Sequence, residues 1–196
     1  MNNPSEIATP IQTTPLHALQ VELGGKMVPF AGYEMAVSFP LGVMGEHNHT
    51  RAKAGLFDVS HMGQVRLHGA DAATALERLL PGDIQGLAPG AMRYSQLTND
   101  RGGIIDDLMV TNTGDHLFLV VNGANKAGDL DHMQAALPST TILEHCTDDA
   151  LMALQGPAAV SVMARLVPGV EKLVFMTAMA ATIAGAECYV SRSGYT

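Results

Sequence analysis

The sequence predicts an α+β fold in which antiparallel sheets carry flanking helices. Apolar residues make up 47% of the 196 residues and charged residues 15%, which favours a folded chain with a sizeable core. Strand-like stretches in the middle of the chain are joined by short turns that contain glycine, and such turns connect antiparallel strands. Helix-like stretches with cap and stop residues lie between them.

Two helices and two strands are expected in the first third of the chain. Thr14 suits a helix cap and Pro15 the first helical position, so a helix is expected to begin there and to end before Gly24. Gly55 can adopt the left-handed conformation that ends a second helix. The expected helices span residues 15–23 and 41–54, and the expected strands span residues 26–31 and 64–68.

A helix and a three-stranded antiparallel meander are expected next. Asp71 suits the cap of a helix over residues 71–80, which Pro81 and Gly82 end. Asn125 caps a later helix that runs to residue 137. The meander strands are expected over residues 94–98, 104–111 and 116–122, with turns at 99–103 and 112–115.

The last quarter of the chain is expected to contain four strands and one helix. The helix begins at Gly156 and runs to Val167, and the strands span residues 141–146, 151–155, 179–183 and 187–191. Because Thr196 follows directly behind a strand pattern, we expect the N-terminal fragment of a longer protein; the alternative is a short domain that ends on a strand. Residues 1–14 have no basic or apolar region of a signal peptide and are expected to be a disordered tail.

Charge and composition exclude several classes of function. The formal net charge of −8 repels polyphosphate, so no nucleic-acid partner is expected. No apolar run is long enough to span a bilayer, so no membrane partner is expected either. Cys146 and Cys188 are too few for a disulfide framework, and they predict buried core thiols in a reducing, cytoplasmic compartment.

The pair Asp106–Asp107 is the most informative feature of the sequence. Neighbouring strand residues point to opposite faces, and both faces of the strand over residues 104–111 carry apolar residues. We therefore expect the strand to be covered on both sides, with at least one carboxylate half-buried. Such a carboxylate has either a functional task or a role in accepting backbone N–H groups, and two carboxylates on opposite faces exclude a glycosidase pair.

The histidines and glycines give weaker signals. His47 and His49 are two apart on an expected helix and face different ways, and with His61 they are expected to be solvated or capping residues, so no metal site is predicted. Gly102 and Gly103 join two strands and form a turn rather than a phosphate cradle. Asn122 ends a strand, where its amide can bind the edge of a flat heterocycle or cap the next turn.

Five segments of the chain resemble motifs of the aminomethyltransferases, the T-proteins of the glycine cleavage system. They are residues 24–32 (GGKMVPFAG), 56–62 (LFDVSHM), 102–107 (GGIIDD), 154–157 (LQGP) and 192–196 (RSGYT). The second and third are together specific for the family. The resemblance implies folate-binding lobes of the T-protein type: residues 15–55 and 146–196 as an incomplete first lobe, and residues 56–145 as an inserted second lobe.

The resemblance also implies a reaction and a site. Family members move a one-carbon unit from the aminomethyl-lipoyl group of the H-protein to tetrahydrofolate and release ammonia. Asp107 holds the position of the catalytic carboxylate and is expected in a pterin-sized hollow. The other implied folate contacts are Met62, Tyr94, Phe118, Val120 and Asn122. We expect this length of chain alone to be inactive, because an open channel loses the enclosure of its ligand.

Two other functions are open at this point. The chain resembles, less closely, the folate-binding tails of sarcosine and dimethylglycine dehydrogenases and the iron–sulfur assembly factors. The intact His61–Met62 pair favours the aminomethyltransferases over these relatives. The third possibility is a truncated module that folds without catalysing a reaction.

Overall fold

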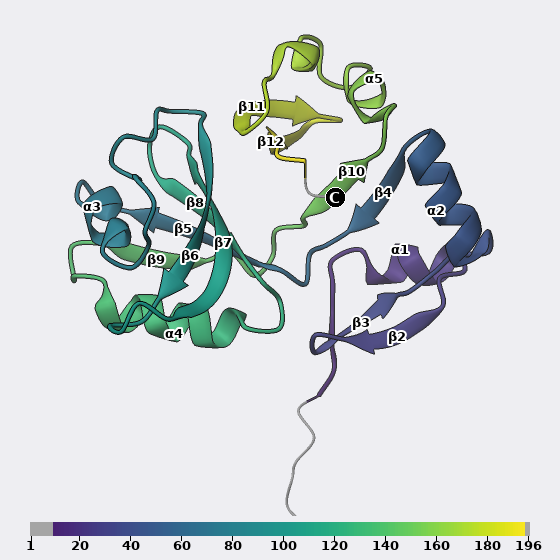
Figure 1. Cartoon of the computed structure of the whole chain (residues 1–196). Coiled ribbons are helices and arrows are strands. Elements are labelled where there is room, and N and C mark those ends of the chain that lie inside the picture. The colour runs from purple at the N-terminus through teal and green to yellow at the C-terminus, as the bar shows by residue number, and fades with distance from the viewer. Residues whose placement is uncertain (1–9, 195–196) are drawn as a thin grey trace, which may run out of the picture.

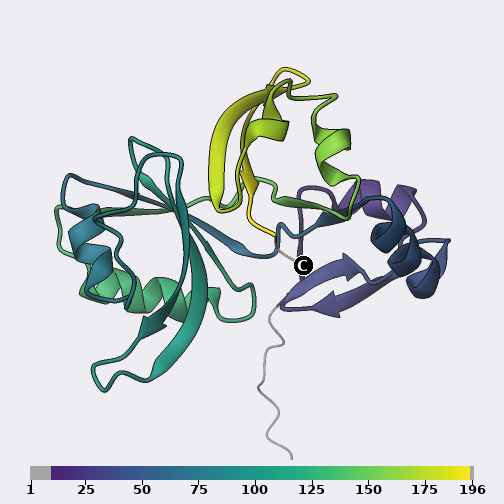
Figure 2. The same cartoon turned by 45° about the horizontal axis from the view of Figure 1, so that its top comes forward.

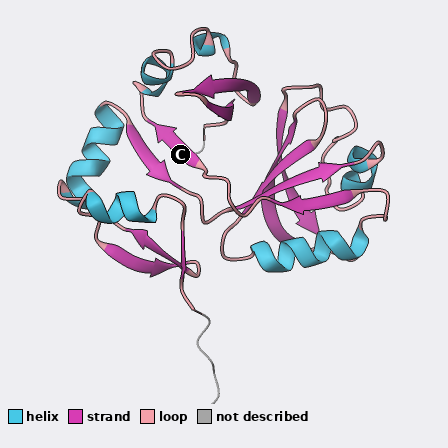
Figure 3. Ribbon diagram, turned by 180° about the vertical axis from the view of Figure 1, so that it is seen from behind, coloured by secondary structure: helices cyan, strands magenta, loops and turns pink. Residues whose placement is uncertain are grey.

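The computed structural model describes residues 10–194 and arranges them in three groups (Figure 1). An N-terminal group, a five-stranded sheet with two helices, and a C-terminal hairpin with short helices lie around the middle of the molecule (Figure 2). Strands dominate and the helices lie at the outside of each group (Figure 3). The predicted α+β class with antiparallel sheets is thereby confirmed.

The N-terminal group contains a small sheet in the order β1-β3-β2. Its elements are β1 (Gln12–Thr13), α1 (His17–Glu22), β2 (Met27–Phe30), β3 (Tyr33–Ala36) and α2 (Gly42–Ala52). The predicted tail over residues 1–14 is wrong at its end, because β1 pairs with β3 and Thr14 is buried; residues 1–9 lie outside the described residues. Thr14 makes no cap bond to α1, since its hydroxyl donates to Asp58 instead.

The middle group is an antiparallel sheet in the order β6-β7-β8-β5-β9. The expected meander forms β6, β7 and β8, while β5 and β9 extend the sheet beyond β8. The elements are β5 (Gly63–His68), α3 (Ala72–Glu77), β6 (Met92–Thr98), β7 (Ile104–Asn112), β8 (Leu117–Val121), α4 (Lys126–Ala136) and β9 (Ile142–His145).

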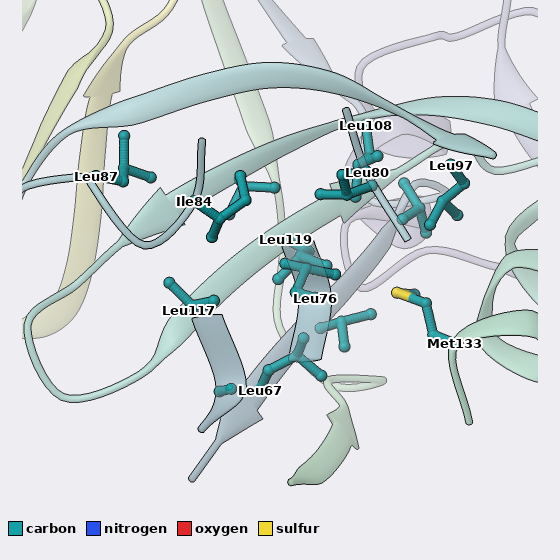
Figure 4. Packing of buried hydrophobic residues seen from close by; sticks show 14 residues of the cluster. Leu67, Leu76, Leu80, Ile84, Leu87, Leu97, Leu108, Leu117, Leu119 and Met133 are labelled. Atoms are coloured by element: carbon teal, nitrogen blue, oxygen red, sulfur yellow. The ribbon is translucent and has the colours of Figure 1, made fainter. Parts of the chain in front are cut away.

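The hydrophobic core lies on one face of this sheet. Val65, Leu119 and Val121 have no exposed surface, and Leu76 of α3 and Met133 of α4 pack against them (Figure 4). Alternate residues of each strand point to this face, which is why they are apolar. The two helices therefore cover one side of the sheet only.

The opposite face of the sheet is partly open. Tyr94 is 54% exposed and Ile105 39%, while Asp107, Met109 and Val120 are half-buried on the same side. The expectation that β7 is covered on both sides is therefore wrong for the described residues. The apolar residues on this side of β7 are not packed beneath a second layer.

A two-stranded ladder joins the middle group to the rest of the chain. The strand β4 (Gly55–Asp58) enters the sheet and pairs antiparallel with β10 (Met152–Gln155), which follows it. The five-stranded sheet itself spans residues 63–145, so the predicted lobe boundary at residue 56 falls inside β4. Sequence analysis did not predict β4, because it follows α2 after a short turn and pairs with a strand almost 100 residues away.

The C-terminal group consists of α5 (Ala159–Met163), a 3₁₀ turn η1 (Val170–Lys172) and the hairpin β11 (Thr177–Ile183) and β12 (Ala186–Arg192). Ala184 and Gly185 have φ values of 51° and 86°, as a tight turn between these strands requires. The hairpin bonds to the loop before β6, where the amide of Ala178 donates to the carbonyl of Gly90 at 2.7 Å.

Candidate active site

The strand β7 presents Asp107 on the partly open face of the sheet. Gln96 of β6 pairs with Asp107, and Met109 pairs with both Tyr94 of β6 and Val120 of β8. Because residues two apart on a strand share a face, these side chains lie on the same side of the sheet as Asp107. The site is thus built on three neighbouring strands.

Two hydrogen bonds hold the Asp107 carboxylate. The hydroxyl of Tyr94 donates to Oδ2 at 2.5 Å, and the side-chain amide of Asn122 donates to Oδ1 at 2.5 Å. The hydrogen bond to Asp107, together with partial burial and the nearby negative charge, raises the pKa of Tyr94. Three of the residues implied by the resemblance are therefore joined directly.

Asp106 lies on the other face and accepts several hydrogen bonds. Its Oδ1 accepts from the Asn122 amide and from the backbone N–H of Asp107, both at 2.9 Å, and its Oδ2 accepts from Asn125 at 3.1 Å. Burial alone would raise the pKa of Asp106, but these hydrogen bonds together lower it below its ordinary value. Asp106 is the carboxylate with the structural task, and the Asn122 amide bridges it to Asp107.

The remaining implied contacts surround this group. Phe118 and Val120 alternate along β8 on the face of Asp107, and both are half-buried. Met62 is buried and directly precedes Gly63, which pairs with Val121. The chain therefore places Met62 at the end of the sheet where Asn122 leaves β8.

Beside Asp107, where a pterin-sized hollow is expected, the face of the sheet is partly open. Two cavities of about 400 Å³ and about 350 Å³ lie elsewhere, the first beside α2 and the start of α5, and the second between the β2–β3 turn and the start of α4. Asp107 lines neither of them. The described residues around Asp107 form one wall of a site and not an enclosure.

The other singled-out residues take structural roles. His47 and His49 are exposed on α2, as expected, but His61 is half-buried with its ring edge against Phe30. Within residues 10–194, no three His, Cys, Asp or Glu side chains are grouped as a metal site would require. Cys146 and Cys188 are half-buried, so the prediction of buried core thiols is wrong.

Sequence analysis missed three residues of the site. Gln96 and Met109 lie beside Asp107 on the open face, and the alternation along the expected strands was the signal for both. Asp129 of α4 is buried beneath Asp106. Its signal was an acidic residue four positions before the apolar Met133 on an expected helix, where both share one face.

Residues 16–196 match the family model described as the GCVT N-terminal domain. The chain belongs to this family. It is 43% identical to the mitochondrial aminomethyltransferase of Dictyostelium discoideum, over 95% of this chain and 49% of that protein. It is 42% identical to the mitochondrial aminomethyltransferase of Gallus gallus, over 95% of this chain and 50% of that protein. The chain thus spans about half the length of these relatives.

Solved structures agree with the family assignment. The crystal structure of the glycine cleavage system aminomethyltransferase T from Bartonella henselae superposes with a TM-score of 0.86 at 39% identity, over 95% of this chain and 51% of that chain. A heterotetrameric sarcosine oxidase from Corynebacterium sp. superposes with a TM-score of 0.53 at 17% identity, over 74% of this chain and 75% of that chain, which shows likeness of fold alone. The Bartonella henselae structure and this chain thus share a fold over most of this chain.

Proposed function

We propose that this chain supplies the folate-facing half of an aminomethyltransferase of the glycine cleavage system. The observation that carries the proposal is the carboxylate of Asp107, held by Tyr94 and Asn122 on a partly open sheet face. Tetrahydrofolate is the proposed co-substrate, and the lipoylated H-protein is the proposed donor of the one-carbon unit. The relatives named aminomethyltransferase support this reading at about 40% identity.

The proposed task of Asp107 is to orient the pterin and to stabilise positive charge. A carboxylate accepts hydrogen bonds from the N–H groups of a reduced pterin and thereby holds the reacting nitrogen in register. Its negative charge also favours the cationic one-carbon unit during transfer. Tyr94 and Asn122 fix the carboxylate before the ligand arrives, so that little reorganisation is needed.

The apolar residues beside Asp107 are proposed to contact the flat face of the pterin. Val120 and Phe118 lie on the same face of β8, and Met109 lies between Val120 and Tyr94 on the neighbouring strands. Met62 closes the end of this wall. Because these residues cover one side only, we expect weak binding of tetrahydrofolate by the chain and no turnover. The cytoplasmic location stays a prediction.

Titration with tetrahydrofolate under anaerobic conditions tests the proposal. The wild-type chain is expected to bind, and Asp107→Asn to weaken binding about tenfold or more, as loss of a charged hydrogen-bond partner does. Asp131→Asn is the matched control, because it makes the same change at an exposed position of α4. Absence of binding, or equal affinity of the wild-type and Asp107→Asn chains, would contradict the proposal.

A further inference from the structure

A carboxyl group without a hydrogen-bond donor lies buried beneath the site. The side chain of Asp129, in the first turn of α4, is only 1% exposed. Neither of its oxygens receives a hydrogen bond from a donor group among the described residues. An ionised carboxylate in such surroundings is strongly unfavourable, because it has lost water and gained no donor in exchange.

The neighbours of Asp129 are acidic. The carboxyl group of Asp129 lies near that of Asp106, and the charges of both Asp106 and Asp107 act on it. Burial, the charge of Asp106, the hydrogen bond to Asp106 and the charge of Asp107 together raise the pKa of Asp129 to about 7.

No basic group of the same helix compensates the charge of Asp129. Lys126 is turned away, since its Nζ donates to the hydroxyl of Tyr33 at 2.5 Å and to the carbonyl of His61 at 3.1 Å. His132 lies one turn further along α4, and its Nε2 is buried without a hydrogen-bond partner. The groups that act on Asp129 are therefore the two carboxylates of β7.

We propose that Asp129 is a positioning residue, a neutral carboxylic acid that donates its proton to Asp106 and thereby keeps Asp107 in place. Asp106 accepts from Asn122 at 2.9 Å, and the same amide donates to Asp107 at 2.5 Å. A neutral Asp129 holds Asp106 in position, and Asp106 in turn positions Asn122 and Asp107. When Asp129 ionises, its carboxylate and that of Asp106 repel each other, and Asp106 is no longer held in position.

The assignment deepens the proposed function and rests on it for the role of Asp107. The presence of a neutral acid at position 129 is a property of the fold and can be measured without a ligand. One experiment therefore tests whether Asp129 is a neutral acid, and a second tests whether it positions Asp107 for binding of tetrahydrofolate.

The first experiment measures urea unfolding of the wild-type chain and Asp129→Asn between pH 5 and 8.5. Asparagine keeps a donor toward Asp106 and cannot ionise. The folded-state pKa of Asp129 is raised, so the folded state binds the proton more tightly than the unfolded state. The wild-type chain should lose stability relative to Asp129→Asn as pH rises through about 7 and then level off. A difference between the two chains that does not change with pH would overturn the proposal, as would a ¹³C carboxyl signal of Asp129 that titrates below pH 5.

The second experiment measures tetrahydrofolate affinity of the same two chains over the same pH range. The wild-type affinity should fall at least about threefold more than that of Asp129→Asn between pH 6.5 and 8.5, since only the wild-type side chain at position 129 ionises. Parallel pH profiles would overturn the positioning role. If the wild-type chain binds no tetrahydrofolate at any pH, the proposed function fails, and the urea and carbon titrations still decide whether Asp129 is a neutral acid.

Discussion

Replacing Val121 and Val120 separately by alanine tests the one-sided architecture of the sheet. The two residues are neighbours on β8, and the substitution removes the same atoms at each position. Val121 has no exposed surface and belongs to the core cluster, whereas Val120 is half-buried on the face of Asp107. The pair therefore differs only in the face to which each side chain points.

The expected costs follow from the burial of each side chain. Truncation of a buried valine loses about 1.6 kcal/mol of transfer free energy, from about 0.8 kcal/mol per carbon removed. The cavity left in the core adds to this, so Val121→Ala should lower the free energy of unfolding by about 2.5 kcal/mol. Val120→Ala loses about half of the transfer term and leaves no enclosed cavity, so about 0.8 kcal/mol is expected.

Urea denaturation followed by far-ultraviolet circular dichroism measures both values on the same scale. The free energy of unfolding is obtained from the midpoint and the slope of each transition. Equal costs for the two variants would refute the reasoning, because they would place Val120 in a second packed layer. A larger cost for Val120→Ala would invert the assignment of the faces.

Two further predictions concern hydrogen bonds between segments. Asp58→Ala should lower the free energy of unfolding by about 2–3 kcal/mol, because the carboxylate accepts hydrogen bonds from Thr14 at 2.7 Å and from the side chains of Gln20 and Ser60. Urea denaturation measures this loss. Glu22→Ala is the control and should cost almost nothing, because Glu22 is exposed. Asp71→Asn should remove a pH-dependent contribution: the hydrogen bond from Thr140 lowers the pKa of Asp71, so its stabilisation is present above pH 4 and lost as pH falls through the folded-state pKa. Unfolding curves between pH 2.5 and 6 that keep a constant gap between the two chains would contradict this.

Local sequence patterns predicted the three-stranded meander, but they did not predict strands that pair with distant parts of the chain. The turns at 99–103 and 112–115 lie within a few residues of the strands they join, so β6, β7 and β8 were predicted within two residues at each end. The strands β4 and β10 pair across almost 100 residues of chain, and no local signal specifies such a partner. The strand predicted over residues 26–31 matches β2, whereas its partner β3 was not predicted.

Part of the candidate site was predictable for a similar reason. Alternation along a strand placed Asp106 and Asp107 on opposite faces, and the structure agrees. Alternation did not reveal that one apolar face of β7 lies open, because the pattern reports the character of a face and not what packs on it. Asp129 also escaped, since its environment depends on how α4 docks against Asp106.

The ladder of β4 and β10 has a consequence for how this architecture can vary. The polypeptide enters and leaves the five-stranded sheet through two strands that lie side by side (Figure 1), and the first and last strands of that sheet along the chain, β5 and β9, are also paired. A segment whose two ends lie side by side can be lengthened, shortened or exchanged without displacing the elements outside it. Evolution can thus change the five-stranded sheet that carries Asp107 while the β4–β10 ladder and the N-terminal and C-terminal groups stay as they are.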